Sequence, residues 1–191
     1  MKSGYDAALS LGFEKLARLT PETVCERCGA RYEDGEYFLA WFNRERALSQ
    51  APTANKIIWL HYLTAHGVKN PSGRLMPYRE AAAALFYESN FIKRAVSPFV
   101  KRFGNDPEGL IKTGEALGGR KADYGGASVI INVLPYIPVT FIIWPGDEEF
   151  EPGGTILFDE TAKTWLGAED LAVLGSLCAY ELIGFKTDNL F

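Results

Sequence analysis

Two nearly continuous apolar runs constrain the fold of this chain more than any other feature. They cover residues 127–134 and 139–144, and Pro135-Tyr136-Ile137-Pro138 joins them. Runs of this length that are rich in Val and Ile are typical of buried strands, because a helix usually extends over about ten residues or more. A third short run, residues 155–158, follows two glycine-containing turns. The three segments predict the core of an antiparallel or mixed central sheet.

The remaining sequence predicts helices and one small meander. Turns at Glu33-Asp34-Gly35 and Asn43-Arg44 divide residues 32–49 into short antiparallel strands. Because helices and strands come in blocks and do not alternate strictly, we predict a single α+β domain over residues 1–191, with helices packed on the central sheet. Helical spacing or start and stop signals mark residues 5–19, 21–29, 52–67, 78–104, 106–118 and 168–183.

Composition excludes several classes of partner. The 20 Lys and Arg residues against 24 Asp and Glu give a net charge of -4, which provides no strong field to attract nucleic acid or an anionic membrane. The longest apolar runs are far shorter than the roughly 20 residues of a spanning helix, and the N-terminal sequence has no signal-peptide core. Three cysteines, an odd number, favour reduced thiols. We predict a cytoplasmic protein with no nucleic-acid or membrane partner.

Residues 134–150 and 155–175 resemble the family described as domain of unknown function three-seven-eight-six. The shared pattern is Pro-x-x-Pro, a strand that ends in Trp, Gly-Asp-Glu-Glu-Phe, Leu-Phe-Asp and a helix with Glu-Asp-Leu. Weaker similarity extends to His61-Tyr62-Leu63 and Tyr78-Arg79, so it covers most of the chain. The residues that carry the strong match are Pro135, Pro138, Trp144, Gly146, Asp147, Glu148, Glu149, Phe150, Leu157, Phe158, Asp159, Glu169, Asp170 and Leu171.

The resemblance brings no established activity, but it implies a metabolic setting. Members come largely from anaerobic bacteria and archaea, and some are fused to a four-cysteine module similar to that of corrinoid iron–sulfur proteins. This implies anaerobic corrinoid or one-carbon metabolism, with a corrinoid or another tetrapyrrole as cofactor and a metalloprotein as partner. Only Cys25 and Cys28 lie close together in this chain. They are a zinc or redox pair, or simply one buried and one exposed thiol.

An acidic turn is the first candidate site. Asp147, Glu148, Glu149 and Glu151 fall within five positions, and if the flanking strands pair, we expect Asp159 to approach the same end. Carboxylates in this number hold Mg²⁺ or Ca²⁺ through oxygen ligands, or provide an acid/base pair. The alternative is a solvated acidic hairpin that protects a sheet edge.

The second candidate is a cofactor site built from His61, Arg120, Lys121 and Trp144. His61 borders the apolar face of its predicted helix and is the one imidazole placed to ligate a tetrapyrrole metal from inside the fold. The alternative is a half-buried histidine satisfied by hydrogen bonds. Arg120 and Lys121 lie in a glycine-rich segment that is either an anion-binding loop or a flexible connection. Trp144 is one of the aromatics that line a flat ligand pocket if one exists.

The leading hypothesis is therefore a non-catalytic protein of anaerobic metabolism that binds a small molecule or cofactor, or a metalloprotein partner. The rival hypothesis is a metal-assisted enzyme in which Asp147 and Asp159 are the first ligands and Glu148 or Glu149 is the base.

Overall fold

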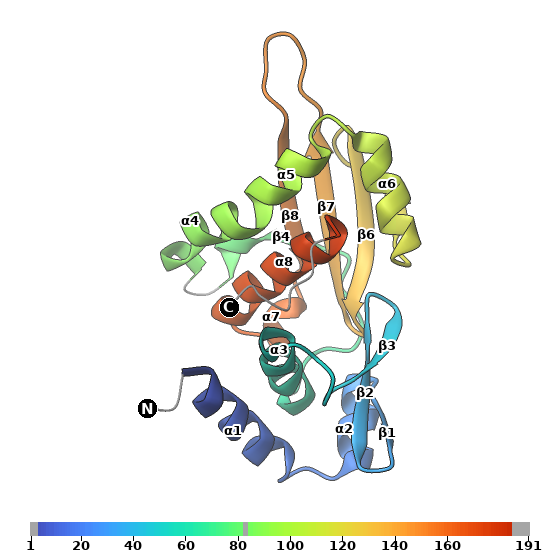
Figure 1. The fold of residues 1–191 in the computed structure, drawn as a ribbon, viewed down its shortest axis with the longest axis vertical. Coiled ribbons are helices and arrows are strands. Elements are labelled where there is room, and N and C mark those ends of the chain that lie inside the picture. The colour runs from blue at the N-terminus through green and yellow to red at the C-terminus, as the bar shows by residue number, and fades with distance from the viewer. Residues whose placement is uncertain (1–3, 82–83, 185–191) are drawn as a thin grey trace.

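The computed structural model describes residues 4–81 and 84–184, and it contains a three-stranded and a five-stranded sheet with helices beside them (Figure 1). The strands are β1 (Arg31–Glu33), β2 (Glu36–Trp41), β3 (Arg44–Ala47), β4 (Leu75–Pro77), β5 (Arg120–Ala122), β6 (Ala127–Leu134), β7 (Ile137–Trp144) and β8 (Gly153–Asp159). The helices are α1 (Gly4–Leu16), α2 (Pro21–Cys28), α3 (Thr53–Thr64), α4 (Glu88–Phe91), α5 (Ser97–Phe103), α6 (Pro107–Ala116), α7 (Ala162–Trp165) and α8 (Ala168–Leu182), with short 3₁₀ turns η1 (Tyr78–Glu80) and η2 (Ala84–Phe86) and the π-helical segment η3 (Ile92–Val96).

The five-stranded sheet has the order β4-β8-β7-β6-β5, and every neighbouring pair is antiparallel. Its three central strands are the three segments that the apolar runs predict. The α+β class and the antiparallel central sheet are therefore confirmed. The edge strands β4 and β5 were not predicted, because three residues are too few to show a period of two.

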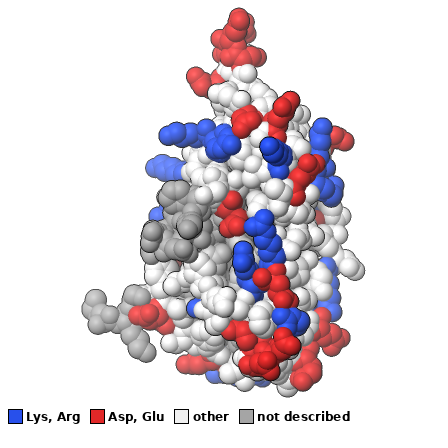
Figure 2. Space-filling model, turned by 45° about the vertical axis from the view of Figure 1, so that its right-hand side comes forward, with Lys and Arg blue, Asp and Glu red and all other residues white. Residues whose placement is uncertain are grey.

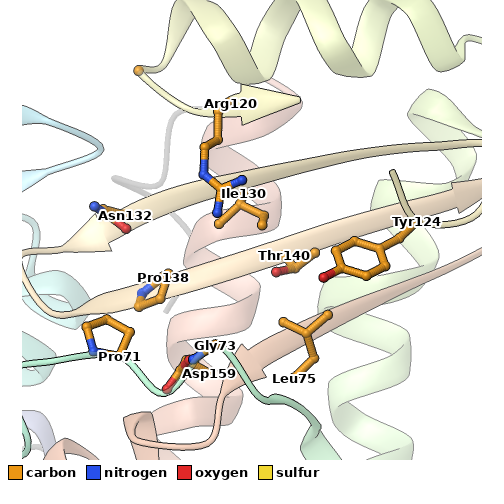
Figure 3. Close-up of a pocket in the computed structure, with 11 residues that line it drawn as sticks. Pro71, Gly73, Leu75, Arg120, Tyr124, Ile130, Asn132, Pro138, Thr140 and Asp159 are labelled. Atoms are coloured by element: carbon orange, nitrogen blue, oxygen red, sulfur yellow. The ribbon is translucent and has the colours of Figure 1, made fainter. Parts of the chain in front are cut away.

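Helices cover one face of this sheet, which we call the helix face. Val129, Phe141 and Phe158 point to it and are fully buried. A Cβ added at Gly114 of α6 would meet Val129, and one added at Gly175 of α8 would meet the rings of Phe91 and Phe158, so both glycines allow close packing on this face. In Figure 1, α5, α6 and α8 lie on this side. On the opposite face, which we call the open face, the residues that line the pocket of Figure 3 come from strands and loops, and none of those described belongs to a helix.

The three-stranded meander has the predicted antiparallel order and the predicted first turn, but its second turn lies at Phe42 and Asn43, one residue before the predicted Asn43-Arg44. The Asp34-Gly35 turn places both residues at positive φ, 49° and 81°, which is the type I′ geometry favoured between two antiparallel strands. The second turn does the same with Phe42 and Asn43. Hydrogen bonds join the meander to β6 and to the loop before β5: Phe42 N–H donates to Val133 O at 3.3 Å, and Asn43 Nδ2 donates to Gly118 O at 2.9 Å.

Several helix ends follow from local chemistry. Thr20 caps α2 by accepting the Thr23 N–H at 3.3 Å, and Asp106 caps α6 by accepting the Gly109 N–H at 2.9 Å, as their positions before Pro predict. Helix α3 ends at Thr64, three residues before the predicted stop at Gly67.

Between α4 and α5 the chain widens into a π-helix, in which the Ser97 N–H bonds to Ile92 O five residues earlier. Pro98 follows at once. A wider turn relieves the clash that a proline ring makes with the carbonyl four residues before it.

No helix in the described part of the chain is long and apolar enough to cross a bilayer.

Candidate ligand-binding groove on the open sheet face

A groove of about 480 Å³ lies on the open face of the five-stranded sheet (Figure 3). A volume of this size falls within the range of small-molecule sites. The strands contribute Leu75, Arg120, Ile130, Asn132, Pro138, Thr140 and Asp159, and three loops contribute Pro71, Gly73, Gly118 and Tyr124.

Strand register explains why these side chains share one face. Arg120 pairs with Ile130, Ile130 with Thr140, and Thr140 with Leu157. Directly paired residues point to the same side of a sheet, so the four side chains form a row across the open face. The residues next to them in sequence, such as Val129 and Phe141, point to the helix face and are fully buried.

Tyr124 enters the groove from the turn between β5 and β6. The Ser128 hydroxyl fixes this turn, since it accepts the Tyr124 N–H at 2.9 Å and donates to Ala122 O at 2.8 Å. The backbone of Gly125 packs directly against β7, because a Cβ at this position would be 2.7 Å from Cγ2 of Ile142. The predicted glycine-rich loop is thus a strand and a tight turn that presents the Tyr124 ring, which is 43% exposed.

Asp159 anchors the loop that forms the opposite wall. Its carboxylate accepts the backbone N–H of Ser72 at 3.0 Å, of Gly73 at 2.7 Å and of Thr161 at 2.9 Å, and the hydroxyls of Ser72 and Thr161 at 3.2 and 2.6 Å. Burial raises the pKa of Asp159, but these donors together outweigh burial and hold the pKa below its ordinary value. Its oxygens are therefore engaged within the protein.

Arg120 and Lys121 point to opposite faces of the sheet. Arg120 pairs with Ile130 and lines the groove, whereas Lys121 pairs with Val129 and lies beside Pro107 of α6. The two cations therefore do not converge on one anion. Arg120 is exposed, and within residues 4–81 and 84–184 no carboxylate forms an ion pair with it.

The acidic turn lies at the tip of the long β7–β8 hairpin, where Figure 2 shows acidic side chains gathered at one end of the molecule. Asp147 Oδ1 accepts the N–H groups of Glu149 and Phe150, both at 2.8 Å, and these bonds lower its pKa. Glu148, Glu149 and Glu151 are exposed.

The expected approach of Asp159 to this turn is wrong. Trp144 pairs with Gly153 next to the turn, whereas Val139 and Phe158 pair at the far end of the hairpin, so Asp159 lies a strand length away. The described residues contain no group of three or more His, Cys, Asp or Glu that is placed to hold a metal ion.

His61 lies away from the groove. Its Nδ1 atom is 2.9 Å from Asp170 Oδ1, and this contact joins α3 to α8. The hydrogen bond with Asp170 raises the pKa of His61, although burial opposes the rise.

Trp144 is 48% exposed. It lies on the open face at the end of the sheet nearest the acidic turn, next to Gly125.

The two neighbouring cysteines differ in environment. Cys28 is fully buried and its thiol lies 3.4 Å from Leu63 O, whereas Cys25 is partly exposed, and both are reduced. Burial raises the pKa of Cys28 to about 11 and also raises that of Cys25.

Sequence reasoning missed Tyr124, Asn132 and Thr140 as site residues. The signal for the last two is the alternation within the apolar runs, because Ser128, Asn132 and Thr140 are the polar positions among Val, Ile and Phe. A run that looks buried throughout thus has one face that carries polar groups.

These features define an α+β protein with one helix-covered and one open sheet face, the open face carrying a groove. The chain belongs to the family described as Domain of unknown function (DUF3786), whose family model matches residues 20–181. The resemblance of residues 134–175 is thereby confirmed. Comparison with curated proteins and with solved structures gave no significant match.

Proposed function

We propose that this protein binds a small molecule in the open-face groove and has no catalytic role of its own. The observation that carries the proposal is a preformed groove of about 480 Å³ on the open sheet face, lined by apolar and polar side chains in similar measure. The volume lies in the range of small-molecule sites, and polar groups that converge on a groove provide orientation and specificity.

The groove chemistry favours binding over catalysis. None of the described lining residues is His, Cys, Lys or Ser, so a nucleophile with an adjacent base is not present among them. Asp159 is the carboxylate in the lining, and its five hydrogen bonds hold it in a structural role. Tyr124, which is 43% exposed, supplies a hydroxyl for recognition.

A fragment screen by two-dimensional NMR tests this proposal. At 21.2 kDa the protein is small enough for amide assignments. We expect bound fragments to shift the amide signals of β6, β7 and the turn that carries Tyr124, and to leave those of α1 unchanged. Fragments that bind only elsewhere, or no binding at all, would overturn the proposal.

The cellular setting is part of the proposal and comes from the family resemblance. In this setting the protein works in the cytoplasm of an anaerobe, next to corrinoid or one-carbon enzymes, and delivers or protects a small ligand. Anaerobic purification from the host, followed by native mass spectrometry and an absorbance spectrum, tests it. A retained small molecule without corrinoid absorbance would separate the binding role from the corrinoid setting.

A tetrapyrrole finds little support in the residues around His61. The Nδ1 atom of this imidazole is bound to Asp170, and the ring lies between two packed helices, on the opposite side of the sheet from the groove. The residues around His61 therefore do not fit an axial-ligand site for a tetrapyrrole. The metal-assisted enzyme has no observation in its favour, since Asp147 and Asp159 lie apart and each carboxylate is engaged by backbone N–H groups.

A further inference from the structure

The groove has one charged group that is available to a ligand, the guanidinium of Arg120. Figure 3 shows this side chain extended from β5 over Ile130 toward the middle of the sheet. The carboxylate that lines the same groove, Asp159, is 2% exposed and surrounded by its own donors. Because the Asp159 oxygens are already engaged, Arg120 is the charged group among the described lining residues whose hydrogen-bonding capacity is open to a ligand.

The rest of the lining is suited to a flat apolar body. Leu75, Ile130 and Pro138 form apolar walls, and the Tyr124 ring is 43% exposed beside them. Figure 3 shows Tyr124 at one end of the groove and Asn132 at the other. Aromatic rings contribute stacking beyond burial of area, and amide and hydroxyl groups fix orientation.

From these observations we infer that the ligand is a small anionic molecule with a planar apolar body. Its carboxylate, phosphate or sulfonate binds the Arg120 guanidinium, and its body lies between Tyr124, Ile130 and Leu75. The inference rests on the proposed function, because it names the class of ligand for the same groove. Arginine suits this role since its planar fork binds two oxygens of one oxyanion.

A pair of fluorescent probes tests the charge requirement. 8-Anilinonaphthalene-1-sulfonate carries a sulfonate on an aromatic body, and N-phenyl-1-naphthylamine has nearly the same body without the charge. We expect Arg120→Gln to weaken binding of the sulfonate probe about tenfold or more, and to leave the neutral probe unchanged. Lys121→Gln is the matched control, because it removes a cation one residue away on the other face of the sheet.

Two further variants show whether either probe is in the groove. Leu75→Trp fills part of it, and Tyr124→Ala removes the exposed ring, with circular dichroism to confirm the fold of each. Both changes should weaken both probes. If they do and Arg120→Gln has no effect on the sulfonate probe, the anionic ligand class is wrong and the groove remains a binding site. If neither change affects either probe, the inference fails together with the proposed function.

Discussion

The Nδ1 atom of His61 lies 2.9 Å from Oδ1 of Asp170, and this pair joins the last turn of α3 to the first turn of α8. Each residue lies at the helix end that favours its charge. A helix start favours a carboxylate and a helix end favours a cation, so each partner is also stabilised by its own helix.

The first prediction concerns the pH dependence of this pair. The pKa of His61 is raised in the folded protein, so protonated His61 contributes stability that is complete below its unfolded pKa of about 6.5 and is lost as the pH rises through the folded pKa. We expect the melting temperature of the wild type to fall across that interval. Asp170→Asn should remove most of this fall. An unchanged pH profile in the variant would show that Asp170 does not set the pKa.

The second prediction concerns Asp159. Asp159→Asn replaces one carboxylate oxygen by an NH₂ group, which is a donor and would face the N–H donor of Ser72 or of Gly73. We therefore expect the free energy of unfolding, measured in urea, to drop by about 2–4 kcal/mol. Because its folded pKa is lowered, the wild type should lose the contribution of Asp159 as the pH falls below about 4, whereas the variant lacks this acid-sensitive part.

Asp147→Asn is the control for that experiment. Asp147 also accepts two backbone N–H groups, but it lies exposed at the hairpin tip, so its loss should cost less than about 1 kcal/mol. Equal losses in the two variants would contradict the role of Asp159 as the buried anchor of the groove wall.

The third prediction tests close packing at Gly67. A Cβ at this position would overlap the indole ring of Trp165, which also stacks on Tyr62 with centroids 4.6 Å apart. We expect Gly67→Ala to destabilise the protein by about 1–3 kcal/mol and to change the near-ultraviolet circular dichroism. Gly153→Ala is the control, because a Cβ there meets no atom within 4 Å. A wild-type stability for Gly67→Ala would show that the indole can move aside.

The fourth prediction concerns thiol reactivity. Cys28 and Cys178 are buried with raised pKa values, and Cys25 is partly exposed. A thiol reagent such as Ellman's reagent should therefore label Cys25 in the native protein, slowly because its pKa is raised too, and should reach the other two thiols only after unfolding. Cys25→Ser should abolish the native reaction; residual labelling at the wild-type rate would place the reactive thiol elsewhere.

Where the chain carries strong local signals, the sequence predicts the fold well. The apolar runs gave the central strands, Asp34-Gly35 gave the first turn of the meander, and Thr20 and Asp106 before proline gave two helix starts. The sequence does not predict the edge strands β4 and β5. They are strands because each pairs with a neighbouring strand, and their own composition carries no strand signal.

The candidate site was predicted in part and for incomplete reasons. The sequence predicts Arg120 and Lys121 as a joint anion-binding pair, but only Arg120 of the two lines the groove, because Lys121 points to the other face of the sheet. Asp159 was named as a metal ligand and lines the groove as a buried anchor. Which face of a strand a residue occupies is decided by register, and register depends on a partner strand far away in sequence.

The sequence by itself determined the class of fold, the central strands and the family, because apolar runs, caps and turns act over a few neighbouring residues. Only the tertiary structure decided which sheet face stays open and which side chains meet there. Helices α6 and α8 cover the side of Val129 and Phe158, and the row from Arg120 to Leu157 is left on the other side. Burial on one face is a property of packing, and no short stretch of sequence contains it.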